Sequence, residues 1–211
     1  MQQLLELEGH RVHAPSLSGM SDPETSLADH VDDVVRVIRD EDLAEVQLVG
    51  HSYGGMPITG AAGQVPDRIA RLVYLDAFAP EDGQSAFDVR PDLDAALRPK
   101  AADGLIPPLD PWFAGVDTDE QAQRLRRLLT TTPLRVCTDP VERGDPAAAL
   151  IPRSYVSCTR SGFAGVAERV RAAGWDVHVL DAGHMPMETA PRAVASLLCE
   201  IAGARVSEKP H

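Results

Sequence analysis

Short apolar runs alternate with helical patterns along this chain. Each run is partly β-branched and is bounded by turn-forming residues, which is typical of strands buried in a sheet. Strands that alternate with helices indicate an α/β architecture with a mostly parallel sheet. The predicted strands cover residues 10–15, 46–49, 71–76, 154–158 and 176–180.

Helices are predicted between these strands. Ser26 or Asp29 is suited to cap a helix whose apolar residues recur at helical spacing, namely Val31, Val34, Val35, Val37 and Ile38. A small, apolar segment at residues 55–62 is predicted to pack tightly as a helix against the sheet. Two later helices are predicted at residues 163–173 and 191–202.

Residues 79–151 differ from the rest because they are rich in Pro and Asp. Such a length is unusual for a bare loop, so we expect an inserted helical cap over the carboxyl edge of the strands, where α/β sheets bind ligands. In this segment Trp112 and Phe113 either line a substrate pocket or anchor the cap. The predicted organisation is a core of residues 1–78 and 152–204, a cap of 79–151 and a frayed tail of 205–211.

Composition narrows the class of protein. A length of 211 residues suits one domain, and a net charge of −12 disfavours nucleic acid and anionic membranes as partners. There is no apolar run long enough to span a bilayer and no signal-like start. The basic cluster of Arg124, Arg126 and Arg127 is interpreted as a solvated helix face. Three distant cysteines fit reduced thiols, so we expect a cytoplasmic protein without a metal or cofactor.

The motif G-H-S-Y-G at residues 50–54 is the most informative part of the sequence. It follows a predicted strand and precedes a predicted helix, which is the context of a nucleophile elbow. Such a turn holds Ser52 in a strained conformation, and a side chain at either glycine is expected to collide with the neighbouring strand or helix. The N–H of Tyr53 is then expected to point to where an oxyanion would form. A purely structural tight turn is the alternative.

A serine nucleophile needs a base, and histidine has suitable basicity near neutral pH. Among seven histidines, His184 lies on a Gly-containing loop after the last predicted strand. We predict His184 as the general base, with a structural loop histidine as the alternative. His51 precedes the candidate nucleophile and should point away from it, so we interpret it as a packing residue.

The acid should follow one of the strands after the elbow strand. Asp76 stands at the carboxyl end of the strand predicted at residues 71–76, whereas T-R-S-G follows the strand at 154–158 without a carboxylate. Asp181 is a weaker competitor because it lies only three residues before His184. We predict Asp76 as the acid; a carboxylate that merely bonds nearby backbone is the alternative.

Together these features resemble the capped α/β hydrolases, in the small branch that holds plant methyl-salicylate esterases, hydroxynitrile lyases and many bacterial hydrolases. The matching stretches are residues 9–15, 49–56, 74–80 and 182–184. The resemblance implies that Ser52 attacks an acyl carbon, that His184 shuttles protons, and that Asp76 orients the imidazole. In the plant members the acid follows the strand corresponding to residues 155–158, where this chain has Arg160 and Ser161. A bacterial subset with Asp in the position of Asp76 is more similar.

The N-terminus departs from the family pattern. Family members begin with two or more strands and an oxyanion loop, whereas Met1 falls inside the next helix. We therefore expect a missing strand between residues 10–14 and 46–49, and a missing oxyanion donor, whose loss typically costs about 10²–10³ in rate. The sheet then closes directly, leaves a wet gap or borrows a strand from another copy. The expected result is low stability and weak activity, both improved by the family's upstream segment.

The leading functional prediction is a serine hydrolase that cleaves a small, largely apolar carboxylic ester. The candidate substrate-binding residues are Phe78, Trp112, Phe113 and Met185. A lyase of the hydroxynitrile type would use the same serine and histidine, and that family usually adds a cap lysine, for which Lys100 is the candidate. A ligand-binding protein without catalysis is the third reading, because the oxyanion loop is missing.

Overall fold

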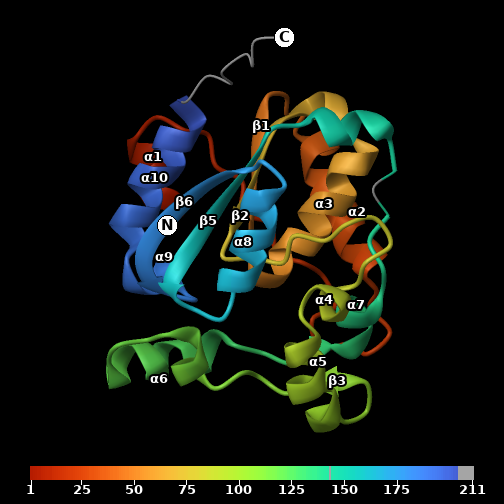
Figure 1. Ribbon diagram of the computed structural model, residues 1–211, viewed down its shortest axis with the longest axis vertical. Coiled ribbons are helices and arrows are strands. Elements are labelled where there is room, and N and C mark those ends of the chain that lie inside the picture. The colour runs from red at the N-terminus through yellow and green to blue at the C-terminus, as the bar shows by residue number, and fades with distance from the viewer. Residues whose placement is uncertain (143, 204–211) are drawn as a thin grey trace.

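The computed structural model describes residues 1–142 and 144–203, built around a four-stranded sheet in the order β1-β2-β5-β6 (Figure 1). Every neighbouring pair of strands is parallel. The four carboxyl ends therefore lie at the same edge of the sheet. This arrangement confirms the predicted α/β class. The strands are β1 (Val46–His51), β2 (Ile69–Leu75), β5 (Arg153–Arg160) and β6 (Asp176–Gly183).

Helices cover both faces of this sheet, and the inner strand β2 is apolar on both sides. Leu72 and Tyr74 of β2 belong to the larger core, with α2, α3 and α8, whereas Val73 and Leu75 pack with α10 and α1. Figure 1 shows α1 and α10 together on one side of the sheet and α2, α3 and α8 on the other. These helices are α1 (Gln2–Leu7), α2 (Leu27–Asp40), α3 (Gly55–Gln64), α8 (Ala164–Ala172) and α10 (Pro191–Gly203).

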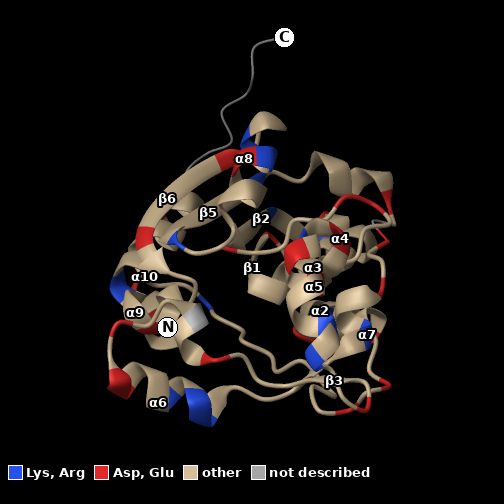
Figure 2. Ribbon diagram, turned by 60° about the horizontal axis from the view of Figure 1, so that its bottom comes forward, with Lys and Arg blue, Asp and Glu red and all other residues tan. Residues whose placement is uncertain are grey.

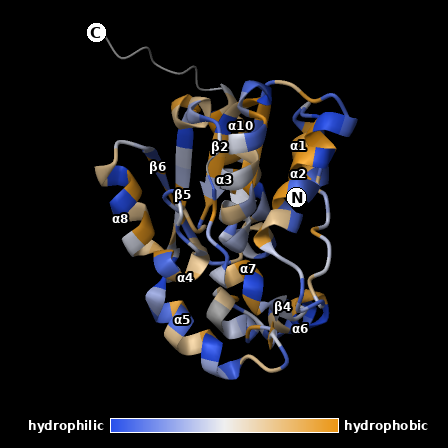
Figure 3. Cartoon of the chain, turned by 90° about the vertical axis from the view of Figure 1, so that its right-hand side faces the viewer, coloured by the Kyte–Doolittle hydropathy of each residue, from blue (hydrophilic) through white to orange (hydrophobic). Residues whose placement is uncertain are grey.

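Helix α2 begins with the cap that the sequence predicts. The hydroxyl of Ser26 accepts a hydrogen bond from the N–H of Asp29, and the Asp29 carboxylate accepts one from the N–H of Ser26 at 2.8 Å. This reciprocal arrangement pairs two N–H groups that the first helical turn leaves open. Helices α5 and α8 carry both hydrophilic and hydrophobic residues (Figure 3). Among the described residues, none of the helices is both long and apolar enough to cross a membrane.

The prediction of a strand at residues 10–15 is wrong. These residues carry no regular secondary structure, and β1 pairs only with β2 among the described strands. A run of strand-forming residues becomes a strand only when a neighbour satisfies its backbone groups, so local pattern was insufficient here. The predicted tail at 205–211 lies outside the described residues.

Within residues 79–151, the short elements from α4 to α6 lie at the end of the sheet toward which the β5 arrow points, whereas the last helical turn, Pro146–Leu150, precedes β5 and lies at the opposite end (Figure 1). The segment also contains an antiparallel pair of two-residue strands that the sequence did not suggest. We keep the name cap for residues 79–151. Its elements are α4 (Ala86–Val89), α5 (Pro91–Leu97), η3 (Arg98–Lys100), β3 (Leu105–Ile106), η4 (Pro111–Ala114), α6 (Asp119–Leu128), β4 (Thr132–Pro133), α7 (Leu134–Thr138) and η5 (Pro146–Leu150).

The cap touches the segment after β6 at very close range. The N–H of Met185 donates to the carbonyl of Ala114 at 3.0 Å. A Cβ atom on Gly115 would lie 2.6 Å from the Cα of Gly183, so both positions need glycine. Helix α6, which shows acidic and basic residues in Figure 2, adds an ion pair of 2.9 Å from Arg124 to Glu188 in α9 (Pro186–Thr189).

We predict that Gly115→Ala destabilises the protein more than Gly83→Ala does. Both glycines have positive φ, +71° and +76°, but a Cβ on Gly83 meets nothing within 4 Å. Gly83→Ala therefore carries only the backbone strain, about 1 kcal/mol, and Gly115→Ala adds overpacking for a total of about 2–3 kcal/mol. Urea unfolding of both variants measures the difference. Equal losses would show that the cap can move away from Gly183 without cost.

Candidate active site

Ser52 follows β1 and opens a 3-10 turn, η1 (Ser52–Gly54), that leads into α3. Its φ is +53°, a left-handed conformation that non-glycine residues rarely adopt, as the elbow motif predicts. A Cβ on Gly50 would lie 2.4 Å from the carbonyl oxygen of Gly54. The expectation for Gly54 is wrong, because a Cβ there meets nothing within 4 Å. The crowded glycine is instead Gly55, whose Cβ would overlap the carbonyl of Phe78.

Asp76 follows β2 and is fully buried, with a φ of +46°. Its N–H donates to the carbonyl of Val156 at 2.7 Å, and its Oδ1 accepts from the N–H of Cys158 at 3.0 Å. The hydroxyl of Tyr155 donates to the carbonyl of Ala77 at 2.9 Å. Strand β5 thus holds the backbone of Asp76 and Ala77 and binds Oδ1, which leaves Oδ2 for another partner.

His184 follows β6 and joins the other two residues. Its Nδ1 lies 2.7 Å from Asp76 Oδ2, and its Nε2 lies 2.9 Å from Ser52 Oγ. Because a carboxylate only accepts, Nδ1 carries the proton, and Nε2 is free to accept from the Ser52 hydroxyl. The competing carboxylate, Asp181, is exposed and accepts a hydrogen bond from Thr159 at 2.7 Å. The arrangement can draw a proton from Ser52 into the imidazole.

Known proteins resemble this chain in sequence and in fold. Residues 1–197 match the model of the alpha/beta hydrolase family. This chain belongs to that family. An extracellular α/β-hydrolase from a Paenibacillus species has a similar solved structure, with a TM-score of 0.81 and 27% identity over 94% of this chain and 90% of that one.

Two relatives carry names that describe chemistry. A carbendazim hydrolyzing esterase from Nocardioides sp. is 43% identical over 117 residues, which cover 53% of this chain and 44% of the esterase. A probable hydrolase from Phoma sp., R7, is 31% identical over 174 residues, which cover 75% of this chain and 70% of that protein. The match therefore spans less than half of the length of the esterase.

Tyr53 is tied to α2 in this α/β-hydrolase family member. The fully buried His30 lies between Tyr53 and the loop before α2. Its Nε2 is 2.8 Å from the carbonyl of Ser18, so Nε2 donates and Nδ1 accepts from the Tyr53 hydroxyl at 2.9 Å. Burial raises the pKa of Tyr53, which therefore stays a neutral donor. These bonds fix the residue whose N–H is the predicted oxyanion donor.

His51 has a more specific role than the packing that the sequence suggested. Its Nε2 lies 2.6 Å from the backbone carbonyl of His184, and the two rings are 4.8 Å apart. Burial, followed by the neighbouring charge of His184, lowers the pKa of His51 to about 4. The ring is therefore neutral near pH 7 and donates from Nε2. Sequence alone gave no signal for this contact, because it joins residues at the ends of two strands that are not neighbours.

The four candidate substrate contacts lie in different surroundings. The N–H of Phe78 donates to the carbonyl of Ser52 at 3.0 Å, and its side chain is buried. Met185 packs against the cap cluster of Ala114, Val116, Ala122 and Leu125. Trp112 lies in η4 with 48% of its surface exposed. The backbone of Phe113 also belongs to η4, but its side chain lies outside the described part of the structure.

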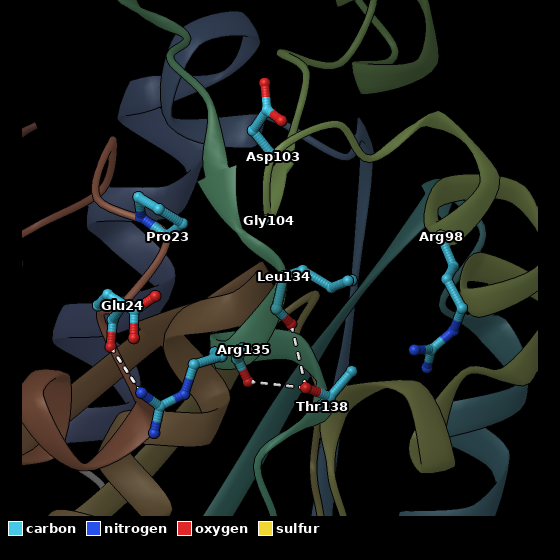
Figure 4. A pocket seen from close by; sticks show the side chains of 8 residues that line it. All are labelled: Pro23, Glu24, Arg98, Asp103, Gly104, Leu134, Arg135 and Thr138. Atoms are coloured by element: carbon cyan, nitrogen blue, oxygen red, sulfur yellow. Dashed lines mark hydrogen bonds between the residues drawn. The ribbon is translucent and has the colours of Figure 1, made fainter.

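A cavity of about 510 Å³ lies between the cap and the loop before α2 (Figure 4). The guanidinium of Arg135 donates to the backbone carbonyl of Glu24 at 2.8 Å along one wall of it. Its lining includes none of Ser52, Asp76 and His184, and it is bordered by both acidic and basic side chains. We therefore do not assign it to the candidate active site.

The cysteines are poor competitors of Ser52 as nucleophiles. Cys137, Cys158 and Cys199 are all free. Burial raises the pKa of Cys137 and of Cys158 to about 12, so both thiols are protonated near pH 7. A protonated thiol is a weak nucleophile.

We predict that, between pH 4 and 6.5, the free energy of unfolding depends less on pH in His51→Gln than in the wild type. The pKa of His51 is about 4 in the folded state and about 6.5 when unfolded, so between these values the unfolded chain binds the extra proton. Wild-type stability should therefore fall as pH drops from 6.5 to 4, by up to about 3 kcal/mol from this residue. Gln can keep the hydrogen bond but cannot titrate.

Urea unfolding of both proteins between pH 4 and 7 measures the effect. His178→Gln, at a histidine that pairs with Asp176 on β6, is the control for replacing a histidine elsewhere in the sheet. Identical slopes for the wild type and His51→Gln would show that His51 does not stay neutral in the folded protein.

Proposed function

We propose that this chain is a serine esterase that cleaves a small, largely apolar carboxylic ester through an acyl-enzyme. The observation that carries the proposal is the unbroken line of hydrogen bonds from Ser52 through His184 to Asp76. The esterase and hydrolase names of its relatives support the same class of reaction. A mere ligand-binding protein has no need for a hydroxyl paired with a buried imidazole and carboxylate.

In the proposed reaction Ser52 Oγ attacks the acyl carbon while Nε2 of His184 takes its proton. The same nitrogen then gives the proton to the departing alcohol, and water releases the acyl group by the reverse sequence. Asp76 holds Nδ1–H and faces the imidazolium that forms. Since the carboxylate has no exposed surface, it interacts with the imidazolium through little intervening water.

The oxyanion in this proposal is bound by the N–H of Tyr53, which lies in the first turn of η1, directly before α3. Such early N–H groups have no partner inside the helix and carry its positive end. The bond from Tyr53 to His30 supports this role because it fixes the residue on its far side. Phe78, Met185, Trp112 and Phe113 are the proposed substrate contacts. The free cysteines support a reducing, cytoplasmic location.

A hydroxynitrile lyase is the second candidate, because an Arabidopsis alpha-hydroxynitrile lyase is 36% identical over 88 residues. The cap lysine that such a reaction would use is represented by Lys100, which is exposed in η3. Lys209 lies outside the described residues. Cyanide release from mandelonitrile that depends on Ser52 would favour the lyase over the esterase.

We predict that Ser52→Ala reduces hydrolysis of p-nitrophenyl acetate to the uncatalysed rate, and that Asp76→Asn lowers kcat by about 10⁴. An amide at position 76 can donate to the imidazole, which favours the wrong tautomer. Asp181→Asn is the matched control. Asp181 lies in β6, and in the described contacts its carboxylate bonds only Thr159 of β5. Full activity of Ser52→Ala, or a large loss in Asp181→Asn with none in Asp76→Asn, would contradict the assignment.

A further inference from the structure

We propose that the turn of residues 161–163, after β5, is the positioning element of the active site: Ser161 holds the acid and Phe163 holds the base. The inference rests on the proposed function and adds two residues to it. In this region the chain has Arg160 and Ser161 where plant family members have the acid. The contacts give that serine a role of its own.

Ser161 donates to the carboxylate of Asp76. Its Oγ lies 2.8 Å from Asp76 Oδ1 and 3.3 Å from the carbonyl of Cys158. The N–H of Phe163 donates to the same hydroxyl oxygen at 3.2 Å and occupies one of its lone pairs. Of the two acceptors within reach of the hydroxyl proton, the charged Oδ1 is the nearer. Hydrogen bonds to a charged acceptor are stronger than neutral ones. Ser161 therefore fixes the rotation of the carboxylate, and with it the oxygen that faces His184.

Phe163 stacks on the ring of His184. The ring centroids are 5.0 Å apart and the planes differ by only 6°. Phe163 is itself held edge-on by Phe78, with centroids 5.1 Å apart and planes at 89°. The stack restricts rotation of the imidazole about its bond to the backbone, so that Nε2 stays directed toward Ser52. One short turn therefore orients both partners of the Asp76–His184 bond.

Arg90 of the cap packs against this turn. Its guanidinium carbon lies 4.7 Å from the centroid of the Phe163 ring, within the range of a cation–π contact. A Cβ on Gly162 would lie 3.2 Å from Nη2 of Arg90, so glycine allows this approach. Asp92 pairs with the same guanidinium through two hydrogen bonds, of 2.7 Å and 2.5 Å. The cap is in this way connected to the ring of His184 through Arg90 and Phe163.

The test uses the full chain with p-nitrophenyl acetate as the probe. We expect Ser161→Ala to lower kcat about tenfold with an unchanged KM, because the acid is misoriented while substrate binding is not. Phe163→Leu should lower kcat about fivefold. Ser161→Thr restores the hydroxyl and should recover most of the loss. Thr159→Val is the control, since it removes another hydroxyl–carboxylate bond at the end of the same strand.

A structural role and a positioning role are separated by a double-mutant cycle. The rate at which a p-nitrophenyl phosphonate modifies Ser52, followed by mass spectrometry, can be measured even in slow variants. If Ser161 acts through Asp76, Ser161→Ala should have almost no further effect on this rate in the Asp76→Asn protein. Equal effects in both backgrounds, or a loss in Thr159→Val as large as in Ser161→Ala, would overturn the inference. An active Ser52→Ala protein would instead refute the proposed function itself.

Discussion

The buried carboxylate of Asp76 is the constraint around which the rest of the site is arranged. A charge without exposed surface is costly unless hydrogen bonds surround it. Three groups meet this need: the N–H of Cys158, the hydroxyl of Ser161 and Nδ1 of His184. Two of them come from β5 and the turn after it, and the third from the loop after β6. The parallel order β2-β5-β6 brings all three groups to one carboxylate. The topology of the sheet therefore determines which groups surround Asp76.

The left-handed backbone at Ser52 and Asp76 follows from the same geometry. Each residue directly follows a strand, with φ values of +53° and +46°, and each must turn its side chain toward the open edge of the sheet. Conformations of this kind cost about 1–3 kcal/mol and persist only where surrounding contacts determine them. Here the contacts are mutual, because the N–H of Phe78, after Asp76, donates to the carbonyl of Ser52. This hydrogen bond joins the two turns, so each turn helps to keep the other in its left-handed conformation.

Sequence predicted the four strands of the sheet, the left-handed turn at Ser52 and the three residues of the hydrogen-bonded line because each is marked locally. Ser52 has its glycine motif, and Asp76 and His184 each stand where an apolar run ends. Local marks failed where the deciding contact was distant. Residues 10–15 have the composition of a strand but no strand partner among the described residues. The crowding at Gly55 comes from the carbonyl of Phe78, and the bond of His51 goes to the backbone of His184. No spacing rule within one segment could reveal these contacts.

The contacts that hold His184 in place come from separate parts of the chain. His51 holds the carbonyl of His184 from β1, Phe163 stacks on its ring from the turn after β5, and the cap accepts the N–H of Met185. A loop after an edge strand has few backbone partners of its own, so its position has to be fixed by other elements. Asp76, after an inner strand, obtains the same rigidity from pairing within the sheet. The cap therefore supplies part of the framework that keeps the imidazole between Ser52 and Asp76.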